Sequence, residues 1–553
     1  MPARFNRKTQ NSEGLNSGGG GGILSVMTTN RRTFLRQLGC GAAGLGFIPF
    51  IPFSMAAARA VGGKRLLRST PEAEGVSSVG VLAFLDAMAA AKHELHSFIL
   101  VRHGRVVAEG WWSPYAPQFN HTMYSMSKSF TSTAVGFAVA EGRLSVDDKV
   151  VKFFPGDLPA TVSDNLAAMR VKDLLSMAAG HAKDPTFEIV KHENWAKVFL
   201  EWPVPQTPGS LFVYNSGATY MCSAIVQKLT RQRIIDYLRP RLFAPLGIEG
   251  ATWETCPRGI CTGGWGLSIQ TEGLAKFGQL YLQKGVWKGR QVLPAKWVEE
   301  ATTFKIQQPL PPKPARPNAQ NDWLQGYGYQ FWRAQHNAYR GDGAFGQFTI
   351  VMPDQDAVLA ITSESKSMQG ELDIVWEHLL PAMKKRPLPA DPASLARLKT
   401  TLSSLTLLPP KNQTSSPTAA LVSGKTYKLD SNDLSLRSVS FAFRKDGCVV
   451  AFKDNRATHS VACGIERWQR GETALPGTPP RLISGGAPKP GTKHKLVASG
   501  TWTNADIFEM TWRYHETPHR DTVTCRFDGD KVSIEFAASI NSRKRPVLRG
   551  QAG

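Results

Sequence analysis

Residues 123–142, MYSMSKSFTSTAVGFAVAEG, decide how the first half of the chain is interpreted. Apolar residues recur there at helical spacing and Gly142 closes the pattern, so the stretch predicts a helix with Ser125 at or just inside its N-terminus. Lys128 follows Ser125 by three residues, which places both side chains on one helix face. A serine becomes a good nucleophile when a base removes its proton, and a lysine can be that base when burial lowers its pKa. The run therefore predicts a Ser–Lys pair at a helix N-terminus, where backbone N–H groups can stabilise an oxyanion.

The segments on either side of this helix predict one sheet made from both ends of a domain. Residues 76–92 have the pattern of a helix, and residues 96–112 predict two strands around the hairpin signal His103-Gly104. Helical patterns and loops dominate the middle of the domain. Further strands and a closing helix are expected at 326–334, 345–353, 356–364 and 368–385. The predicted fold class is α/β (α+β), an antiparallel sheet flanked by helices, with the middle segment forming a helical lobe and a cleft between the two.

The rest of the chain has a different pattern. Residues 386–422 are rich in Pro, Ser and Thr, which is typical of a linker. Beyond them, short β-rich runs follow one another at nearly regular spacing, which predicts an all-β barrel or sandwich. The predicted parts are an N-terminal extension with an export signal, a first folded domain, a linker and a β-rich C-terminal domain, at residues 1–60, 61–385, 386–422 and 423–545.

Paired arginines near the N-terminus predict export. Arg31 and Arg32 precede a moderately apolar, Gly/Ala-rich stretch, as in a twin-arginine signal, with cleavage expected after Ala58 or Ala60. Because such a signal lies close to the start codon, Met27 competes with the first methionine as the initiator. The predicted location is periplasmic or extracellular, with no stable membrane insertion once the signal is removed.

The amino-acid composition limits the kinds of partner and cofactor that are expected. A net charge of +22 can indicate a polyanionic partner, but the Lys and Arg residues are scattered and no nucleic-acid-binding motif occurs, so no nucleic acid is expected. Cysteines outside the signal permit disulfides, with Cys256–Cys261 the nearest pair, and no spacing typical of a zinc site occurs. In HETPHRD, residues 515–521, His515 and His519 are four apart, but the run lies beside a proline between strands, so a metal site is not expected there.

Six ordered motifs carry a resemblance to a known family. They are the run from Met123 to Pro155, VKDLLSMAAGH, YNSGATYMCSAIVQKLT, FAPLGI, GGWGLSIQTEGLAKFGQLYLQKGVWKGRQVLP and DGAFGQFTIVMPDQDAVLAITSE. Together they resemble the serine β-lactamase-like superfamily, which includes class C β-lactamases, DD-peptidases, β-lactamase-fold esterases and 6-aminohexanoate-dimer (nylon-oligomer) hydrolases. The likeness covers about residues 65–385. In its motifs the chain looks most like the nylon-oligomer hydrolases.

The resemblance implies a role for each site residue. It makes Ser125 the acylated nucleophile and Lys128 its activating partner, and Tyr214 in YNS matches the tyrosine that moves a proton to the leaving group. A phenol can exchange a proton with a lysine of similar pKa, so the residue type suits that role. The backbone N–H groups of Ser125 and Ala344 are expected to form the oxyanion hole, with Asp342 as the alternative to Ala344. The resemblance implies no metal and no cofactor.

Two departures from the family pattern bear on the substrate. Class C β-lactamases have Tyr-x-Asn where this chain has Ser216 as the third residue, and Gly341-Asp342-Gly343 stands where the family has Lys-Thr-Gly or His-x-Gly. The second change removes a cation that would bind the carboxylate of a penicillin or of a peptide C-terminus. Ser216, Asp342 and Gly343 are therefore predicted to line the cleft of a different substrate, and Gly343 would let that substrate approach the backbone closely.

The sequence thus predicts an exported serine hydrolase that cleaves an amide or ester bond of a small molecule through a Ser–Lys–Tyr acyl-enzyme mechanism. One alternative is a β-lactamase or DD-peptidase acting on β-lactams or cell-wall peptides. An alternative of another class is a non-catalytic protein that binds a ligand or wall polymer. The substrate, the role of the C-terminal domain and the oligomeric state are left open.

Overall fold

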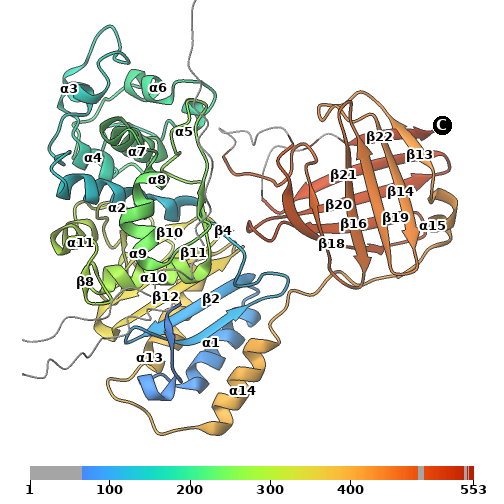
Figure 1. The fold of residues 1–553 in the computed structure, drawn as a ribbon, viewed down its shortest axis with the longest axis horizontal. Helices are drawn as coiled ribbons and strands as arrows, with labels where there is room; N and C mark the ends of the chain where they lie inside the picture. Colours follow the sequence, from blue (N-terminus) through green and yellow to red (C-terminus); the bar gives the residue numbers. More distant parts are fainter. Residues whose placement is uncertain (1–64, 484–490, 541–544, 546) are drawn as a thin grey trace, which may run out of the picture. The chain divides into compact units, whose positions relative to one another are not determined.

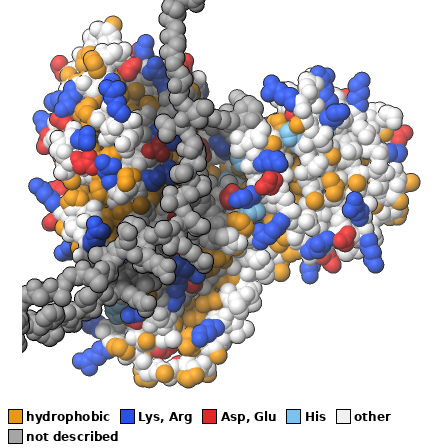
Figure 2. Space-filling view, viewed as in Figure 1, with side chains coloured by type: hydrophobic (Ala, Val, Ile, Leu, Met, Phe, Trp, Pro, Cys, Tyr) orange, Lys and Arg blue, Asp and Glu red, His pale blue; other side chains and the backbone are white. Residues whose placement is uncertain are grey.

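The computed structural model describes residues 65–483, 491–540, 545 and 547–553. The predicted extension with its export signal, residues 1–60, lies outside the described residues. Within the described part of the chain, no helix has both the length and the apolar character needed to cross a membrane. Figure 2 shows Lys and Arg side chains scattered over the visible face rather than gathered in one patch, which agrees with their distribution in the sequence.

A seven-stranded sheet forms from both ends of the first domain, as the sequence predicts (Figure 1). Its order is β1-β3-β2-β12-β11-β10-β9, and the β1–β3 pair is parallel while the other pairs are antiparallel. His103 and Gly104, between β2 and β3, have positive φ (48° and 74°), as a two-residue type I′ turn requires. The strands are β1 (Leu67–Arg68), β2 (Leu95–Arg102), β3 (Arg105–Trp111), β9 (Trp332–Arg333), β10 (Tyr339–Gly343), β11 (Gln347–Met352) and β12 (Ala357–Ser363).

The strand expected at 326–334 is reduced to the two residues of β9. Gly326 and Gln330 adopt positive φ (99° and 67°) there, and such residues interrupt an extended run. The sheet instead gains β10, which carries the Gly-Asp-Gly motif.

Side chains alternate between two cores across the central strands. In β2, Phe98 and Leu100 are buried in one core, and Ile99 and Val101 in the other. Helices α1 (Ser78–Ala90), α12 (Met368–Ile374) and α14 (Pro392–Ser403) lie on the first face, while α2 (Ser127–Ala140) and α10 (Thr271–Leu282) lie on the second (Figure 1). Because both faces are covered, strands β2, β11 and β12 are buried along their whole length, and the middle of β2, residues 98–101, is a continuous apolar run.

Helices from the middle of the chain form a second lobe, as expected (Figure 1). Its central helix, α7 (Ser216–Thr230), packs against α2 and four shorter helices. Asn215 is the N-cap of α7 because its side chain accepts a hydrogen bond from the backbone N–H of Ala218, and this fixes Tyr214 and Ser216 at the start of the helix. The other helices of the lobe are α3 (Asp164–Ala168), α4 (Val171–Leu175), α5 (Thr186–Ile189), α6 (Trp195–Glu201), α8 (Ile234–Leu238), α9 (Ala244–Leu246) and α11 (Ala295–Thr302).

The C-terminal domain is a closed β-barrel, which is one of the two predicted architectures. Nine strands form the ring in the order β16-β15-β14-β13-β22-β21-β20-β19-β18, and a short parallel pairing of β18 with β16 closes it. Strand β17 pairs with the first part of β18. Large side chains such as Trp502 and Trp512 fill the interior. The strands are β13 (Thr426–Leu429), β14 (Ser438–Arg444), β15 (Gly447–Lys453), β16 (Thr458–Ile465), β17 (Gln469–Thr473), β18 (His494–Trp502), β19 (Ile507–Arg513), β20 (Arg520–Asp528), β21 (Lys531–Ala538) and β22 (Leu548–Ala552).

The segment expected to link the two domains carries two helices, α14 and α15 (Pro417–Val422). Each begins with a proline after a capping side chain, Asp391 in α14, which is a strong helix-start signal within the Pro-rich run. Leu398 of α14 is buried in the core beside α1, so this part of the segment packs on the first domain. The described residues, from 65 onward, belong to one compact unit.

The six described cysteines are free thiols, and all of them are buried. Cys256 and Cys261, the nearest pair in the sequence, are therefore not joined by a disulfide.

Candidate active site

Ser125 lies in a short 3₁₀ turn, η2 (Tyr124–Met126), that leads directly into α2. The sequence predicted this serine at or just inside a helix N-terminus, and the structure places it two residues before α2 begins. Tyr124, immediately before it, has a φ of 47°, a left-handed conformation that costs a non-glycine residue about 1–3 kcal/mol and persists only where surrounding contacts hold it. The half-buried Ser125 side chain stays accessible from one side.

Lys128, in the first turn of α2, is buried with about 1% of its surface exposed. Its Nζ atom lies 3.1 Å from Ser125 Oγ, 2.9 Å from Ser216 Oγ and 2.8 Å from the carbonyl oxygen of Gly264. A neutral amine has two N–H donors and one lone pair. Gly264 and Ser216 can accept the two N–H bonds, which leaves the lone pair for the Ser125 hydroxyl.

Burial lowers the pKa of Lys128 to about 7, although the carboxylates of Asp184 and Asp342 act in the opposite direction. Burying an ammonium ion costs free energy, and no carboxylate forms a direct hydrogen bond with Lys128 to offset this cost. Burial therefore favours the neutral amine. At neutral pH a large fraction of Lys128 is therefore uncharged and able to accept the proton of Ser125.

Tyr214 lies beside the same pair. Lys128 Nζ is 4.8 Å from the centre of its ring. Burial raises the pKa of Tyr214 above that of free tyrosine, and the nearby carboxylate of Asp342 raises it further. The phenol is therefore protonated at neutral pH, which suits a proton donor and disfavours a resting phenolate. Its ring stacks on Trp332, with ring centres 5.5 Å apart.

Strand β10 ends against the turn that holds Ser125. A Cβ atom placed on Gly343 would lie 2.1 Å from the carbonyl oxygen of Met123, so glycine is required at this approach. Ala344, the next residue, is half-buried beside the same turn. The structure thus brings the end of β10 together with Ser125, Lys128 and Tyr214.

Asp342 does not stand free in the cleft. It is buried, and its Oδ2 atom lies 3.1 Å from Nη2 of the fully buried Arg340, an ion pair without hydrogen-bond alignment. Burial raises the pKa of Asp342, while Arg340 and Lys128 lower it. The Arg340 guanidinium in turn lies over Trp323, 4.5 Å from the ring centre. The strand does carry a cation beside the Gly-Asp-Gly motif, but this cation is paired with Asp342.

A pocket of about 480 Å³ opens beside Tyr124, the neighbour of the serine. Trp265 and Gly266 line it on one side, directly after the Gly264 carbonyl that contacts Lys128. The barrel lines the other side with Arg481, Lys495 and other residues. Its volume is typical of a site for a small molecule.

Sequence reasoning missed two features of the site. Asp184 accepts hydrogen bonds from the backbone N–H of Ser216 (3.3 Å) and of Thr186 (3.0 Å), so it fixes the start of α7. The second feature is the Gly264 carbonyl, which contacts Lys128. It lies in the GGWGLS motif, and this motif could have indicated that the segment belongs to the site. His181, at the end of the VKDLLSMAAGH motif, is buried with Nδ1 2.9 Å from the Asn215 amide, and burial lowers its pKa to about 4. Among the described residues, no group of three or more His, Cys, Asp or Glu side chains is arranged to hold a metal ion.

The sequence of the chain also matches a known protein family. The family model described as Beta-lactamase matches residues 86–381, which is more than half of the chain and spans Ser125, Lys128, Tyr214 and Ala344.

Two curated relatives match shorter stretches. The chain is 27% identical over 220 residues to the 6-aminohexanoate-dimer hydrolase of Paenarthrobacter ureafaciens, covering 37% of this chain and 56% of that protein. It is 23% identical over 195 residues to a putative D-alanyl-D-alanine carboxypeptidase of Salmonella schwarzengrund (strain CVM19633), covering 30% of this chain and 44% of that protein. The matches thus span about half the length of these relatives.

A solved structure described as a putative 6-aminohexanoate-dimer hydrolase from Bacillus anthracis is 19% identical, with a TM-score of 0.46, covering 59% of this chain and 89% of that one.

Proposed function

The chain belongs to the beta-lactamase family, and on this basis we propose that it hydrolyses an amide or ester bond of a small molecule through an acyl-enzyme on Ser125. The contact of the buried Lys128 amine with the Ser125 hydroxyl carries the proposal, because it pairs a nucleophile with a base that is largely neutral at pH 7.

In the proposed acylation step, Lys128 takes the proton of Ser125 as Oγ attacks the substrate carbonyl carbon. The N–H groups of Ser125 and Ala344 hold the negative oxygen of the tetrahedral intermediate. When this intermediate collapses, Tyr214 gives its proton to the leaving amine or alcohol, and the Lys128 ammonium returns a proton to the phenolate.

Deacylation runs through the same groups. A water molecule replaces the leaving group, gives up a proton to Lys128 or through Tyr214 to Lys128, and attacks the ester carbonyl. The tetrahedral intermediate then expels Ser125 Oγ, which recovers its proton from Lys128, and the carboxylic acid leaves. Lys128 and Tyr214 thus end each half-reaction in the protonation state in which they began it, while Ser125 loses its proton in acylation and regains one from water in deacylation. No cofactor is needed for this balance.

We expect the protein to prefer a small amide or ester to a β-lactam or a peptide with a free C-terminus. Arg340, the cation nearest the Gly-Asp-Gly motif, is neutralised by Asp342 and buried, so it is not available for a substrate carboxylate. Similarity to a 6-aminohexanoate-dimer hydrolase fits a linear amide whose carboxylate is separated from the scissile nitrogen by a methylene chain, so it would not need a cation beside the scissile bond. Similarity to a putative D-alanyl-D-alanine carboxypeptidase makes cell-wall peptides, whose carboxylate is next to the scissile nitrogen, the second candidate.

A substrate panel tests this proposal. Purified protein is given p-nitrophenyl butyrate, 6-aminohexanoate dimer, D-alanyl-D-alanine peptides and nitrocefin, each with wild type and Ser125→Ala. We expect Ser125-dependent turnover of the ester or the linear amide. Brisk nitrocefin or peptide turnover that is lost in Ser125→Ala would make the second candidate the function. No turnover, together with no labelling of Ser125 by a fluorophosphonate, would favour a non-catalytic binding protein.

Export through the twin-arginine route is part of the proposal and rests on the sequence of residues 27–60. Replacing the pair with lysines, Arg31→Lys and Arg32→Lys, retains the charge but removes the guanidinium groups that such signals use. We expect the variant to accumulate as an unprocessed precursor in the cytoplasm, measured by fractionation and N-terminal sequencing. Ser125→Ala is the matched control and should be exported like wild type; unchanged export of the lysine variant would contradict the signal assignment.

A further inference from the structure

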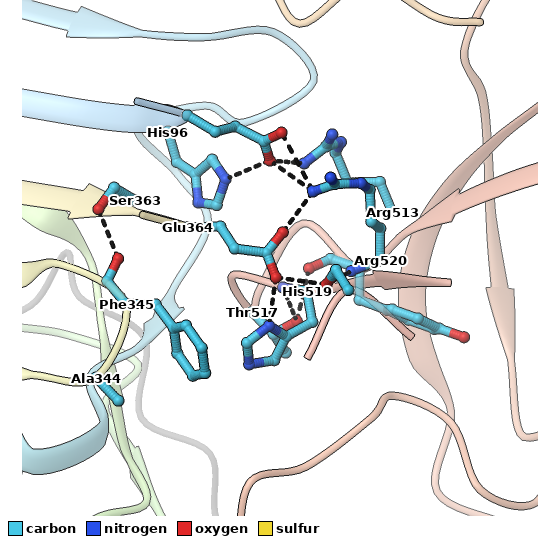
Figure 3. Close-up of polar contacts among 12 residues, drawn as sticks. His96, Ala344, Phe345, Ser363, Glu364, Arg513, Thr517, His519 and Arg520 are labelled. Atoms are coloured by element: carbon cyan, nitrogen blue, oxygen red, sulfur yellow. Dashed lines mark hydrogen bonds and ion pairs between the residues drawn. The ribbon is translucent and has the colours of Figure 1, made fainter. Parts of the chain in front are cut away.

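The run HETPHRD, in which no metal site was expected, covers most of the loop between β19 and β20 and the first two residues of β20, and it places His519 against the first domain. The His519 side chain is fully buried. Its Nδ1 atom lies 2.7 Å from Oε1 of Glu364, which follows β12 (Figure 3). Its Nε2 atom forms a short hydrogen bond with the hydroxyl of Tyr124. Tyr124 is the residue that precedes Ser125.

The hydrogen bonds around Glu364 fix the orientation of the His519 ring. Arg520 Nη1 donates to Glu364 Oε2 at 2.5 Å, and the Ser539 hydroxyl donates to Oε1. A carboxylate held by a guanidinium is ionised and only accepts, so His519 donates from Nδ1. In the tautomer with its proton on Nδ1, the imidazole has its lone pair at Nε2, where it can accept the hydrogen bond of the Tyr124 hydroxyl.

The same imidazole packs on a second residue next to the proposed oxyanion hole. The ring of Phe345, which follows Ala344, meets His519 edge to face at 4.8 Å between centres and meets Tyr124 at 5.5 Å. Phe345 has a φ of 69° and Tyr124 a φ of 47°, so both residues are left-handed without being glycine. Such conformations persist only where surrounding contacts determine them, and His519 contacts both.

We propose that His519 of the barrel, oriented by Glu364, is a positioning residue of the active site. It holds Tyr124 and Phe345, and through them it sets the direction of the neighbouring Ser125 and Ala344 N–H groups toward the oxyanion. This inference rests on the proposed hydrolase function. It gives the C-terminal domain a task in the reaction, since the catalytic domain alone lacks this imidazole.

Two variants test the inference in the full-length protein. His519→Ala removes the ring, and Tyr124→Phe removes only the hydroxyl that His519 holds. His515→Ala is the matched control, because His515 lies in the same loop but packs on Phe119, at 4.4 Å between ring centres. Each variant is assayed for kcat and KM on a substrate that wild type turns over, and for its dissociation constant with phenylboronic acid, whose tetrahedral adduct on serine mimics the oxyanion intermediate. Circular dichroism and Tm show whether each variant is folded.

Deleting one oxyanion donor outright costs about 100- to 1000-fold in kcat, so misdirecting the donors should cost about 10- to 100-fold. We expect that loss of kcat in His519→Ala with KM within about threefold of wild type, and a boronate dissociation constant that rises by a similar factor. Tyr124→Phe should show a smaller loss of the same kind. The double variant should be no slower than His519→Ala, because the two residues act through one contact.

Wild-type kcat and boronate affinity in folded His519→Ala, or an equal loss in His515→Ala, would overturn the inference. If His519→Ala does not fold, the outcome for Tyr124→Phe decides: an unchanged kcat in that variant also overturns it. Failure of the proposed function gives a different result, since wild type itself would then be inactive or its activity would survive Ser125→Ala.

Discussion

At the scale of single residues, the buried amine of Lys128 determines how the reaction depends on pH. Its pKa is lowered to about 7, and only the neutral amine can take the proton of Ser125. We expect kcat/KM to fall about tenfold for each pH unit below this value and to level off above it. A pH–rate profile from pH 5 to 9 measures this dependence.

Lys128→Arg tests whether Lys128 acts as a base or only as a positive charge, because arginine stays protonated throughout this pH range. Activity lost at every pH is expected for this variant. Lys197→Arg, an exposed position on α6, serves as the control and should keep the wild-type profile. A flat wild-type profile down to pH 5 would show that Lys128 is not the base.

The loss of turnover on removing the Tyr214 hydroxyl is expected to depend on how strongly the leaving group needs a proton. Its pKa is raised, so it holds a proton that an amine leaving group needs and that p-nitrophenolate does not. Tyr214→Phe should therefore lower turnover of an amide by about 100-fold or more, and of a p-nitrophenyl ester by less than about tenfold. The ratio of the two losses is the measurement. Equal losses on both substrates would assign Tyr214 to packing against Trp332 instead.

At the scale of elements, the approach of β10 to η2 makes glycine necessary at position 343. A methyl group there would meet the Met123 carbonyl at 2.1 Å, so Gly343→Ala must push the strand or the turn aside. Overpacking of this kind costs about 1–3 kcal/mol of stability, and the displaced turn carries Ser125. We expect a lower Tm and a loss of kcat/KM, measured by calorimetry and steady-state kinetics.

Gly471→Ala on β17 is the matched control, because a Cβ there would have no heavy atom within 4 Å. It should leave both Tm and kcat/KM near their wild-type values. Wild-type kinetics in Gly343→Ala would mean that β10 is not part of the site.

Local patterns were enough to predict the hairpin, the helix that carries Lys128 and the spacing of the Ser–Lys pair. The His103-Gly104 turn, the helix after Ser125 and the closing helix follow from residue spacing and from glycine at the required positions, and the Lys128–Ser125 contact follows from their spacing on one face. Contacts between distant segments could not be predicted in this way. The pairing of Arg340 with Asp342 depends on two residues of β10 sharing a face of a strand that the sequence did not delimit.

The role of His519 needed the structure for the same reason. Nothing local to HETPHRD indicates that the Tyr124 hydroxyl, 395 residues before His519, forms a hydrogen bond with its ring. The expected linker also held more structure than its composition indicated, since prolines at helix starts and prolines in open coil look alike in a Pro-rich run. The domain division, the export signal and the roles of the site residues stay predictions.

At the scale of the whole molecule, Glu94 connects the sheet domain to the barrel. Its carboxylate accepts from Arg513 at 2.6 Å and from Arg520 at 3.2 Å. The pKa of Glu94 lies well below its usual range: burial would raise it, but bonds to His96 and Arg513 lower it by more. A carboxyl group with a lowered folded pKa stabilises the protein above the unfolded pKa near 4.5, and this contribution is lost as the pH falls below that value.

Glu94→Gln should therefore lower the free energy of unfolding by about 1–3 kcal/mol at pH 7, since hydrogen bonds to a charged group are replaced by weaker ones. The difference from wild type should shrink by about 1.4 kcal/mol for each pH unit below 4.5. Urea unfolding at pH 7, 5 and 3.5 measures it. Glu201→Gln, an exposed carboxylate on α6, is the control and should match wild type at each pH. A constant deficit of Glu94→Gln across this range would contradict the ionic origin.

The barrel is closed by a short pairing between two strands, β16 and β18. Where β16 meets β18, Gly464 and Ile465 pair with Ser499 and Gly500, and three of these four residues have little or no side chain to add packing. The Phe508 ring lies directly inside this pairing, against Gly500. Thermal openings begin where the fewest bonds must break, so this seam is where solvent would first reach the aromatic interior while the remaining strands stay paired.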